Sequence, residues 1–188
     1  MNGTIVYLIG HYGVGKLTVA RQICDQTGAR LFDNHLTNNV IFSLVRADGR
    51  TPLPERVWDF IGAIRDQAVA AIEELAPPEA SFVLTNALME GDPVDRATYE
   101  HIVRLAERRV SVFVPVLLTA SDEAHAKRIP SPEREERLKH TDPASAERKR
   151  RHTRLLAVDH PNRLDLDTTD LPPQQAARII IDHAERLR

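Results

Sequence analysis

The sequence predicts an α/β protein built on a parallel sheet. Short apolar runs alternate with amphipathic helical segments along all 188 residues, and a glycine-rich turn joins the first apolar run to the first helix. Strands that alternate with helices pair in parallel, through right-handed crossovers that place helices against the sheet. With 42% apolar and 28% charged residues, the composition is that of a soluble globular protein. The length fits a single domain, which we expect to span residues 1–188.

Glycine and proline fix most of the predicted boundaries in the first half of the chain. Gly28 ends the first helix, and Pro77 ends the third one. The second helix places Leu36, Val40 and Leu44 on one face, and the third carries apolar residues at helical spacing. We expect, in order, strand 4–9, helix 16–27, strand 30–33, helix 34–46, helix 55–76 and strand 81–85.

The second half contains an apolar run, residues 110–118, as expected of a strand that is buried on both faces. Ser121 is suited to cap the short helix that ends at Arg128. Asp165 and Asp167 alternate with leucines, which indicates a strand with one polar face, and we assign these two acids no catalytic role. We expect, in order, helix 94–109, strand 110–118, helix 122–128, helix 144–158, strand 164–167 and helix 172–187.

The segment GHYGVGKLT, residues 10–18, has the layout of a phosphate-binding loop: a strand, a glycine-rich turn, a lysine and a helix. Glycines let consecutive backbone N–H groups point into one concavity, to which the start of the helix adds its positive dipole. Lys16 adds a full positive charge that reaches the β- and γ-phosphates. The alternative is an ordinary glycine turn between a strand and a helix. We predict that ATP is bound by Gly10, Gly13, Val14, Gly15, Lys16, Leu17 and Thr18.

Leu17 stands where the standard loop has the serine or threonine that contacts Mg²⁺. Leucine offers no oxygen to a hard cation. We therefore expect Mg²⁺ to be held through water by Thr18 and Asp33, together with oxygens of the nucleotide.

Polar residues follow several of the predicted strands, and the carboxyl ends of parallel strands meet at one edge of a sheet. Asp33 and His35 come directly after the second strand. Either residue could orient or deprotonate an attacking hydroxyl group, and Asp33 could instead hold Mg²⁺-bound water. The competing interpretation is that Asp33 or Asn34 only caps the following helix. Thr85 and Asn86, after the third strand, give a weaker signal at the same edge.

Arginines supply the candidate anion-binding groups. Arg65, on the helix predicted over 55–76, could bind an anionic group of the substrate. The alternative is an ordinary solvated arginine on an amphipathic helix. Residues 127–154 contain ten Lys or Arg and five acids, which suits a lid over about 129–150 that closes on phosphates. The alternative is a solvated helix with Glu–Arg pairs. The candidate lid arginines are Arg128, for the nucleotide, and Arg134 and Arg137, for catalysis.

Four stretches of the chain resemble the small P-loop kinases, which include shikimate kinase, gluconate kinase, chloramphenicol phosphotransferase and the nucleoside monophosphate kinases. The stretches are GVGKLTVA (13–20), DNHLT (33–37), KHTDP (139–143) and DTTDLPP (167–173). The likeness is greatest to shikimate-kinase-like ATPases. It implies a three-layer fold with a five-stranded parallel sheet of order 2-3-1-4-5, a helical lid, ATP as donor and Mg²⁺ as cofactor. It also implies that Thr18 faces the α-phosphate.

The same resemblance does not imply shikimate as the acceptor. Shikimate kinases place paired glycines after the third strand, where this chain has Thr85-Asn86-Ala87. His35 stands where their second-strand pattern D-x-D has its second aspartate. A shared fold does not assign the substrate.

These observations favour an ATP-dependent kinase of a small hydroxylated or phosphorylated metabolite, a cytoplasmic monomer or homodimer. A net charge of −2 argues against a chain built around nucleic acid, and a single cysteine, Cys24, fits a reducing compartment. The first apolar run is too short to span a membrane. Two alternatives stay open: an RNA-directed enzyme or binder that uses the basic residues of 148–154, and a non-catalytic ATP-binding protein, which Leu17 makes worth keeping.

Overall fold

The computed structural model describes residues 1–45, 47, 51, 53–129 and 143–188, with side chains for all of these except 143–146 and 149. Its centre is one sheet of five parallel strands in the order β2-β3-β1-β4-β5. The predicted α/β class and strand order are confirmed. The strands are β1 (Thr4–Gly10), β2 (Arg30–Asp33), β3 (Phe82–Asn86), β4 (Val112–Thr119) and β5 (Leu164–Asp167).

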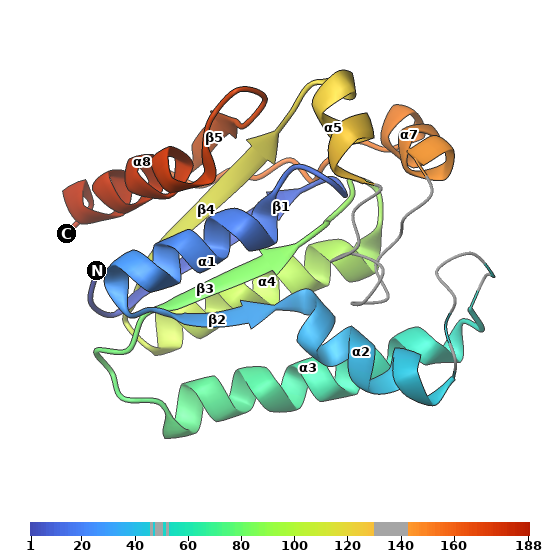
Figure 1. Ribbon diagram of the computed structural model, residues 1–188. Helices are drawn as coiled ribbons and strands as arrows, with labels where there is room; N and C mark the ends of the chain where they lie inside the picture. Colours follow the sequence, from blue (N-terminus) through green and yellow to red (C-terminus); the bar gives the residue numbers. More distant parts are fainter. Residues whose placement is uncertain (46, 48–50, 52, 130–142) are drawn as a thin grey trace.

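Helices cover both faces of the sheet. On one face, α1 (Lys16–Thr27) and α8 (Pro173–Arg186) pack on alternate residues of β1, such as Val6 and Leu8. On the other face, α3 (Arg56–Leu75) and α4 (Pro93–Arg108) pack over Tyr7 and its neighbours. Figure 1 shows α1 and α8 in front of the sheet and α4 behind it. Because β1 lies in the middle of the sheet, all seven of its residues are buried.

The helix α2 (Asn34–Leu44) ends two residues before the predicted limit, and the apolar face predicted from the sequence is not the buried face of the helix. Leu36, Val40 and Leu44 are exposed, whereas Phe42 is buried against the start of α3 with Val57 and Ile61. The helix begins at the residue that follows β2, so no loop residue separates them. The strand end therefore sets the rotation of the helix, and the apolar stripe does not.

Two short helices lie beyond the ends of β1 and β4 (Figure 1), namely α5 (Asp122–Arg128) and α7 (Pro143–His152). The side chain of Ser121 accepts a hydrogen bond from the amide of Ala124, which confirms the predicted cap of α5. The helix predicted over 144–158 is wrong beyond His152. Beyond that residue the chain packs into the core on the face that α3 and α4 cover. Leu156 and Val158 are buried there, and Leu155 forms a bridge with Met89.

Several strand boundaries also differ from the prediction by one or two residues. The third strand begins at Phe82 and reaches Asn86, one residue beyond the predicted end. The fourth begins at Val112, because Val110 has a positive φ of 53° and is exposed after the end of α4.

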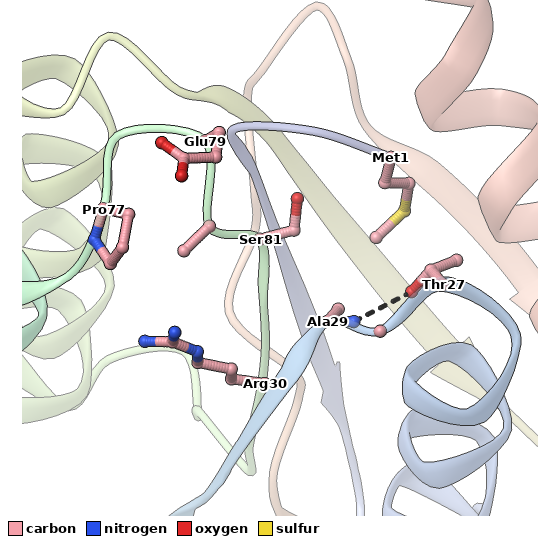
Figure 2. A pocket seen from close by; sticks show the side chains of 9 residues that line it. Met1, Thr27, Ala29, Arg30, Pro77, Glu79 and Ser81 are labelled. Atoms are coloured by element: carbon pink, nitrogen blue, oxygen red, sulfur yellow. Dashed lines mark hydrogen bonds between the residues drawn. The ribbon is translucent and has the colours of Figure 1, made fainter.

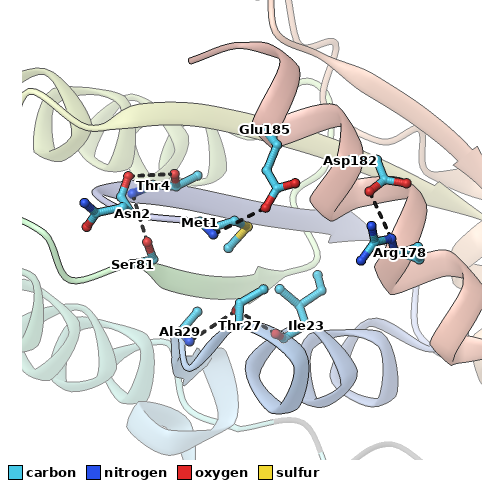
Figure 3. Close-up of polar contacts among 10 residues, drawn as sticks. All are labelled: Met1, Asn2, Thr4, Ile23, Thr27, Ala29, Ser81, Arg178, Asp182 and Glu185. Atoms are coloured by element: carbon cyan, nitrogen blue, oxygen red, sulfur yellow. Dashed lines mark hydrogen bonds and ion pairs between the residues drawn. The ribbon is translucent and has the colours of Figure 1, made fainter.

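The amino edge of the sheet is closed by polar contacts (Figure 3). The hydroxyl of Ser81 accepts a hydrogen bond from the amide of Thr4 at 3.2 Å. The amino group of Met1 lies 3.7 Å from a carboxylate oxygen of Glu185 on α8. The opposite, carboxyl edge carries the glycine turn that follows β1, Asp33 at the end of β2, and Thr85 and Asn86 at the end of β3.

Candidate phosphate-binding site

The turn between β1 and α1 has the conformation for which its glycines are needed. Gly13 and Gly15 have φ values of 86° and 94°, in the left-handed region that glycine adopts without strain. A Cβ atom at Gly10 would lie 2.7 Å from the carbonyl oxygen of Leu118 and 2.8 Å from Cγ2 of Val14. Each of these glycines is therefore required by the path of the chain.

The lysine of this turn is folded over the loop. Nζ of Lys16 donates to the carbonyl oxygens of Gly10, at 2.7 Å, and His11, at 2.9 Å. Gly15 is the N-cap of α1 and has no side-chain oxygen to bond the first amides of the helix. Leu17 is half-buried and Thr18 is exposed in the first turn of α1. The predicted nucleotide-binding residues 10–18 thus form one turn with its lysine at the carboxyl edge.

Two histidines stand in the positive field around this turn. Burial lowers the pKa of His11 to about 4, and the charges of Lys16 and Arg150 add to the effect. Nδ1 of His125 lies 2.7 Å from the carbonyl oxygen of Tyr12, so we assign the proton to Nδ1. Burial, with Arg150 and Lys16, also lowers the pKa of His125. Both rings are therefore neutral near pH 7, and the field around the loop favours an anion.

Asp33, the last residue of β2, is buried at the same edge of the sheet. Its Oδ1 accepts a hydrogen bond from the hydroxyl of Thr85, whose oxygen accepts one from the amide of Asn34 at 3.3 Å. Asp33 occupies the N-cap position of α2, but its side chain makes no cap hydrogen bond. His35 is half-buried in the first turn of α2. Thr85 therefore fixes the carboxylate of Asp33, which is not used as a helix cap.

Arg65 reaches from α3 towards the sheet. Its Nη1 donates to the hydroxyl of Thr98 on α4 at 3.0 Å. Its Nε is buried and has no hydrogen-bond partner among the described residues. Nearby, Asn86 at the end of β3 donates to the hydroxyl of Tyr7 at 3.1 Å. Arg65 is therefore not the freely solvated arginine of the alternative interpretation.

Arg128 joins α5 to the turn that follows β5. Nη1 donates to the hydroxyl of Thr168 at 3.2 Å, and Nη2 donates to the carbonyl oxygens of Thr168, at 2.7 Å, and Thr169, at 3.0 Å. The guanidinium thus belongs to the wall beside the phosphate loop. The other two predicted lid arginines, Arg134 and Arg137, lie outside the described residues, as does most of the segment 129–150.

The sequence interpretation missed Arg150 as an individual site residue. Arg150 on α7 forms an ion pair with Asp122 on α5, and its charge acts on His11 of the loop and His125 of α5. Its only sequence signal was membership of the basic run 148–151, in which helical spacing does not reveal the residue that faces α5. Arg151 pairs with Glu147 instead. Two residues of the run considered for RNA binding are therefore engaged in ion pairs within the protein.

A shallow pocket lies at the amino edge of the sheet, opposite the phosphate loop (Figure 2). Met1, Thr27, Arg30, Glu79 and Ser81 are among the residues that line it. Its volume of about 200 Å³ is below the roughly 300–1,000 Å³ of small-molecule sites, and we assign it no function.

Other reactive groups point to no second site. Burial raises the pKa of the Cys24 thiol to about 11, which disfavours a thiolate nucleophile. In the described part of the chain, no three His, Cys, Asp or Glu side chains gather as metal ligands. No helix there is long and apolar enough to cross a bilayer. The oxygen donors of Asp33 and Thr18 are of the kind that Mg²⁺ prefers when most of its ligands are water and phosphate.

Comparison with solved structures shows the fold. A gluconokinase from Sinorhizobium meliloti 1021 matches with a TM-score of 0.62 at 16% identity, covering 98% of this chain and 93% of that one. A sugar kinase from Janibacter sp. HTCC2649 matches with 0.60 at 19%, covering 98% and 97%. Shikimate kinase from Aquifex aeolicus vf5 matches with 0.51 at 12%, covering 97% of each. No protein-family model and no curated protein sequence matches the chain. The chain therefore shares the fold of these solved kinases.

Proposed function

We propose that this protein is an ATP-dependent phosphotransferase, a kinase that acts on a small hydroxylated or phosphorylated metabolite. The observation that carries the proposal is the turn at residues 10–18, whose glycine conformations and Lys16 form a phosphate-binding loop at the carboxyl edge of the sheet. The buried carboxylate of Asp33 at the same edge supplies the group that phosphoryl transfer needs beside the loop. The kinases that share the fold support the reaction class.

The residues would divide the chemistry as follows. The loop amides and Lys16 bind the β- and γ-phosphates and neutralise the charge that develops on them. The acceptor hydroxyl oxygen forms the new bond to the γ-phosphorus while the bond to the bridging oxygen breaks. Either Asp33, oriented by Thr85, or His35 takes the proton of that hydroxyl. Mg²⁺, held through water by Asp33 and Thr18, would offset phosphate charge.

Other groups would bind the two substrates. Arg150 and the predicted lid arginines Arg134 and Arg137 suit the phosphates, and Arg128 suits the nucleotide side of the loop. Arg65 has an unused buried Nε and suits an anionic group of the acceptor. With one cysteine in the sequence, a reducing, cytoplasmic location fits the proposal.

The first test of this proposal is Lys16→Ala. We expect phosphate transfer to fall at least about a thousandfold, because the charge opposite the transferred group is lost. We expect the fold to persist, with a loss of about 1–2 kcal/mol from the hydrogen bonds to Gly10 and His11. Coupled ATP-consumption assays and thermal unfolding measure the two effects.

Lys127→Ala is the matched control, because it removes one positive charge from exposed α5 at the same edge. It should keep wild-type turnover. Full activity in Lys16→Ala would refute the kinase proposal. Tight ATP binding without transfer to any acceptor would favour the non-catalytic alternative.

A second test separates Asp33 from His35. If Asp33 is the base, Asp33→Asn lowers kcat about 10²–10⁴-fold, the usual contribution of general-base catalysis. His35→Asn then changes kcat less than about tenfold. The reverse pattern would assign the proton to His35. Measuring kcat for both variants requires the acceptor to be known. A screen for ATP consumption is designed to find it, with nucleosides, nucleoside monophosphates, sugar acids, aminoglycosides and amphenicols as candidates.

A further inference from the structure

We propose that Thr168 is a positioning residue for the phosphate loop: its hydroxyl fixes the Val14–Gly15 peptide and so aims the Gly15 N–H group into the loop. The inference rests on the proposed function in one respect, namely that the loop binds a polyphosphate. Thr168 lies directly after β5, 154 residues from Val14 in the sequence, and it is buried. Nothing in the motif of residues 10–18 points to it.

The contact is a hydrogen bond to the outer side of the loop. Oγ1 of Thr168 lies 2.8 Å from the carbonyl oxygen of Val14 and 2.9 Å from that of Thr119. The carbonyl of Thr119 also accepts the backbone amide of Thr168, at 2.9 Å. A hydroxyl has one proton to donate. Because Thr119 already has a donor, we assign that proton to the carbonyl of Val14.

Because of peptide geometry, this hydrogen bond also sets the direction of the Gly15 N–H group. The peptide that carries the Val14 carbonyl also carries the Gly15 N–H, and in a planar trans peptide the two groups point in opposite directions. A carbonyl held by Thr168 on the outer wall therefore turns the Gly15 N–H away from that wall. Gly15 has a φ of 94° and no side chain that would resist rotation. An external bond is thus what keeps this peptide in place.

Thr168 is itself held in the required orientation. Nη1 of Arg128 donates to its hydroxyl oxygen at 3.2 Å, so the hydroxyl proton is left for Val14. The turn that carries it is closed by a 2.7 Å bond from the amide of Thr169 to Oδ1 of Asp167. In the same manner, the ring of His125 holds the carbonyl of Tyr12, two residues before Val14. Within the stretch DTTD, residues 167–170, Thr168 therefore has a physical role at the loop, and Asp167 supports the turn that carries it.

The test compares Thr168→Val, which keeps the shape and removes the hydroxyl, with Thr168→Ser, which restores the hydroxyl. Thr169→Val is the matched control, because the Thr169 hydroxyl accepts from the amide of Ser121 at 2.8 Å and has no bond to the loop. The probes are inorganic tripolyphosphate and ATP, with Kd measured by calorimetry. The Gly15 amide resonance of the ligand-free protein is a second readout, independent of any ligand.

We expect Thr168→Val to weaken both probes about tenfold and to shift the Gly15 amide resonance, since one buried carbonyl loses its donor. Thr168→Ser should stay within about twofold of wild type, and Thr169→Val should leave both readouts unchanged. Wild-type Kd and an unmoved Gly15 resonance in Thr168→Val would overturn the inference. If Thr168→Val does not fold, Thr168→Ala replaces it with the same criteria. If the variants behave as expected but the wild-type protein transfers no phosphate, only the kinase proposal is refuted.

Discussion

At the scale of single residues, His11 reports the charge of the loop. Its pKa of about 4 follows from burial and from Lys16, His125 and Arg150. Because the folded value is below the unfolded value of about 6.5, the unfolded chain binds more protons between these two pH values. His11 therefore contributes to stability above about pH 6.5, and that contribution is lost as the pH falls towards 4.

A bound polyphosphate should reverse this effect. Its negative charge offsets Lys16 and Arg150, so we expect the pKa of His11 to rise by about one unit or more on addition of tripolyphosphate or ATP. NMR titration of the imidazole resonances measures it. His160, whose ring lies edge-on to Phe113 near the start of β4, serves as the control that should not respond to the ligand. An unchanged His11 titration would place the anion elsewhere.

Residues within a local motif could be predicted, and those that act across the fold could not. The conformation of the glycine turn and the place of Lys16 beside it were predictable, because both follow from the spacing alone. Asp33 was predictable because it ends a strand. Arg150 and Thr168 escaped because each acts through contact with an element distant in the sequence, α5 for the first and the phosphate loop for the second. Side-chain pattern carries no information on such contacts.

At the scale of elements, α2 shows where periodicity misleads. Its apolar stripe at Leu36, Val40 and Leu44 suggested a buried face, but the helix is oriented by its direct junction with β2. Its packing onto α3 depends on Phe42, whose ring lies edge-on to Trp58 with centroids 5.9 Å apart.

A pair of substitutions in α2 tests this orientation. Phe42→Ala should lower the free energy of unfolding by about 3–4 kcal/mol, because it opens a cavity between α2 and α3. Leu44→Ala should change it by less than about 0.5 kcal/mol, since this side chain is 75% exposed. Urea denaturation measures both. Equal losses in the two variants would mean that the helix is rotated from the position described.

At the scale of the whole molecule, the alternation of strands and helices was enough to predict a parallel sheet. The strand order 2-3-1-4-5 came from the resemblance to P-loop kinases, because periodicity does not say which strands are neighbours. The chain between α7 and β5 was not predictable as an extended segment. Its apolar residues suit a helix equally well. The bridge to Met89 and the packing under α4 are what keep the segment from forming a helix.

That segment should contribute strongly to stability. Leu156 is fully buried in the core beneath α4, and its amide donates to the carbonyl of Leu88 at 3.0 Å. Leu156→Ala should therefore cost about 2–5 kcal/mol. Arg154→Ala, at an exposed position two residues earlier, should cost less than about 0.5 kcal/mol. Thermal and urea unfolding measure the difference, and a small loss at Leu156 would contradict the packing.

The position of β1 in the middle of the sheet also bears on biosynthesis. The strand that leads into the loop leaves the ribosome before its neighbours β3 and β4, and Thr168 emerges later than all three. A nascent chain halted before that point would hold its glycine turn without the outer contact. On the proposed function, competence to bind nucleotide should therefore arise only once β5 and Thr168 have joined the sheet.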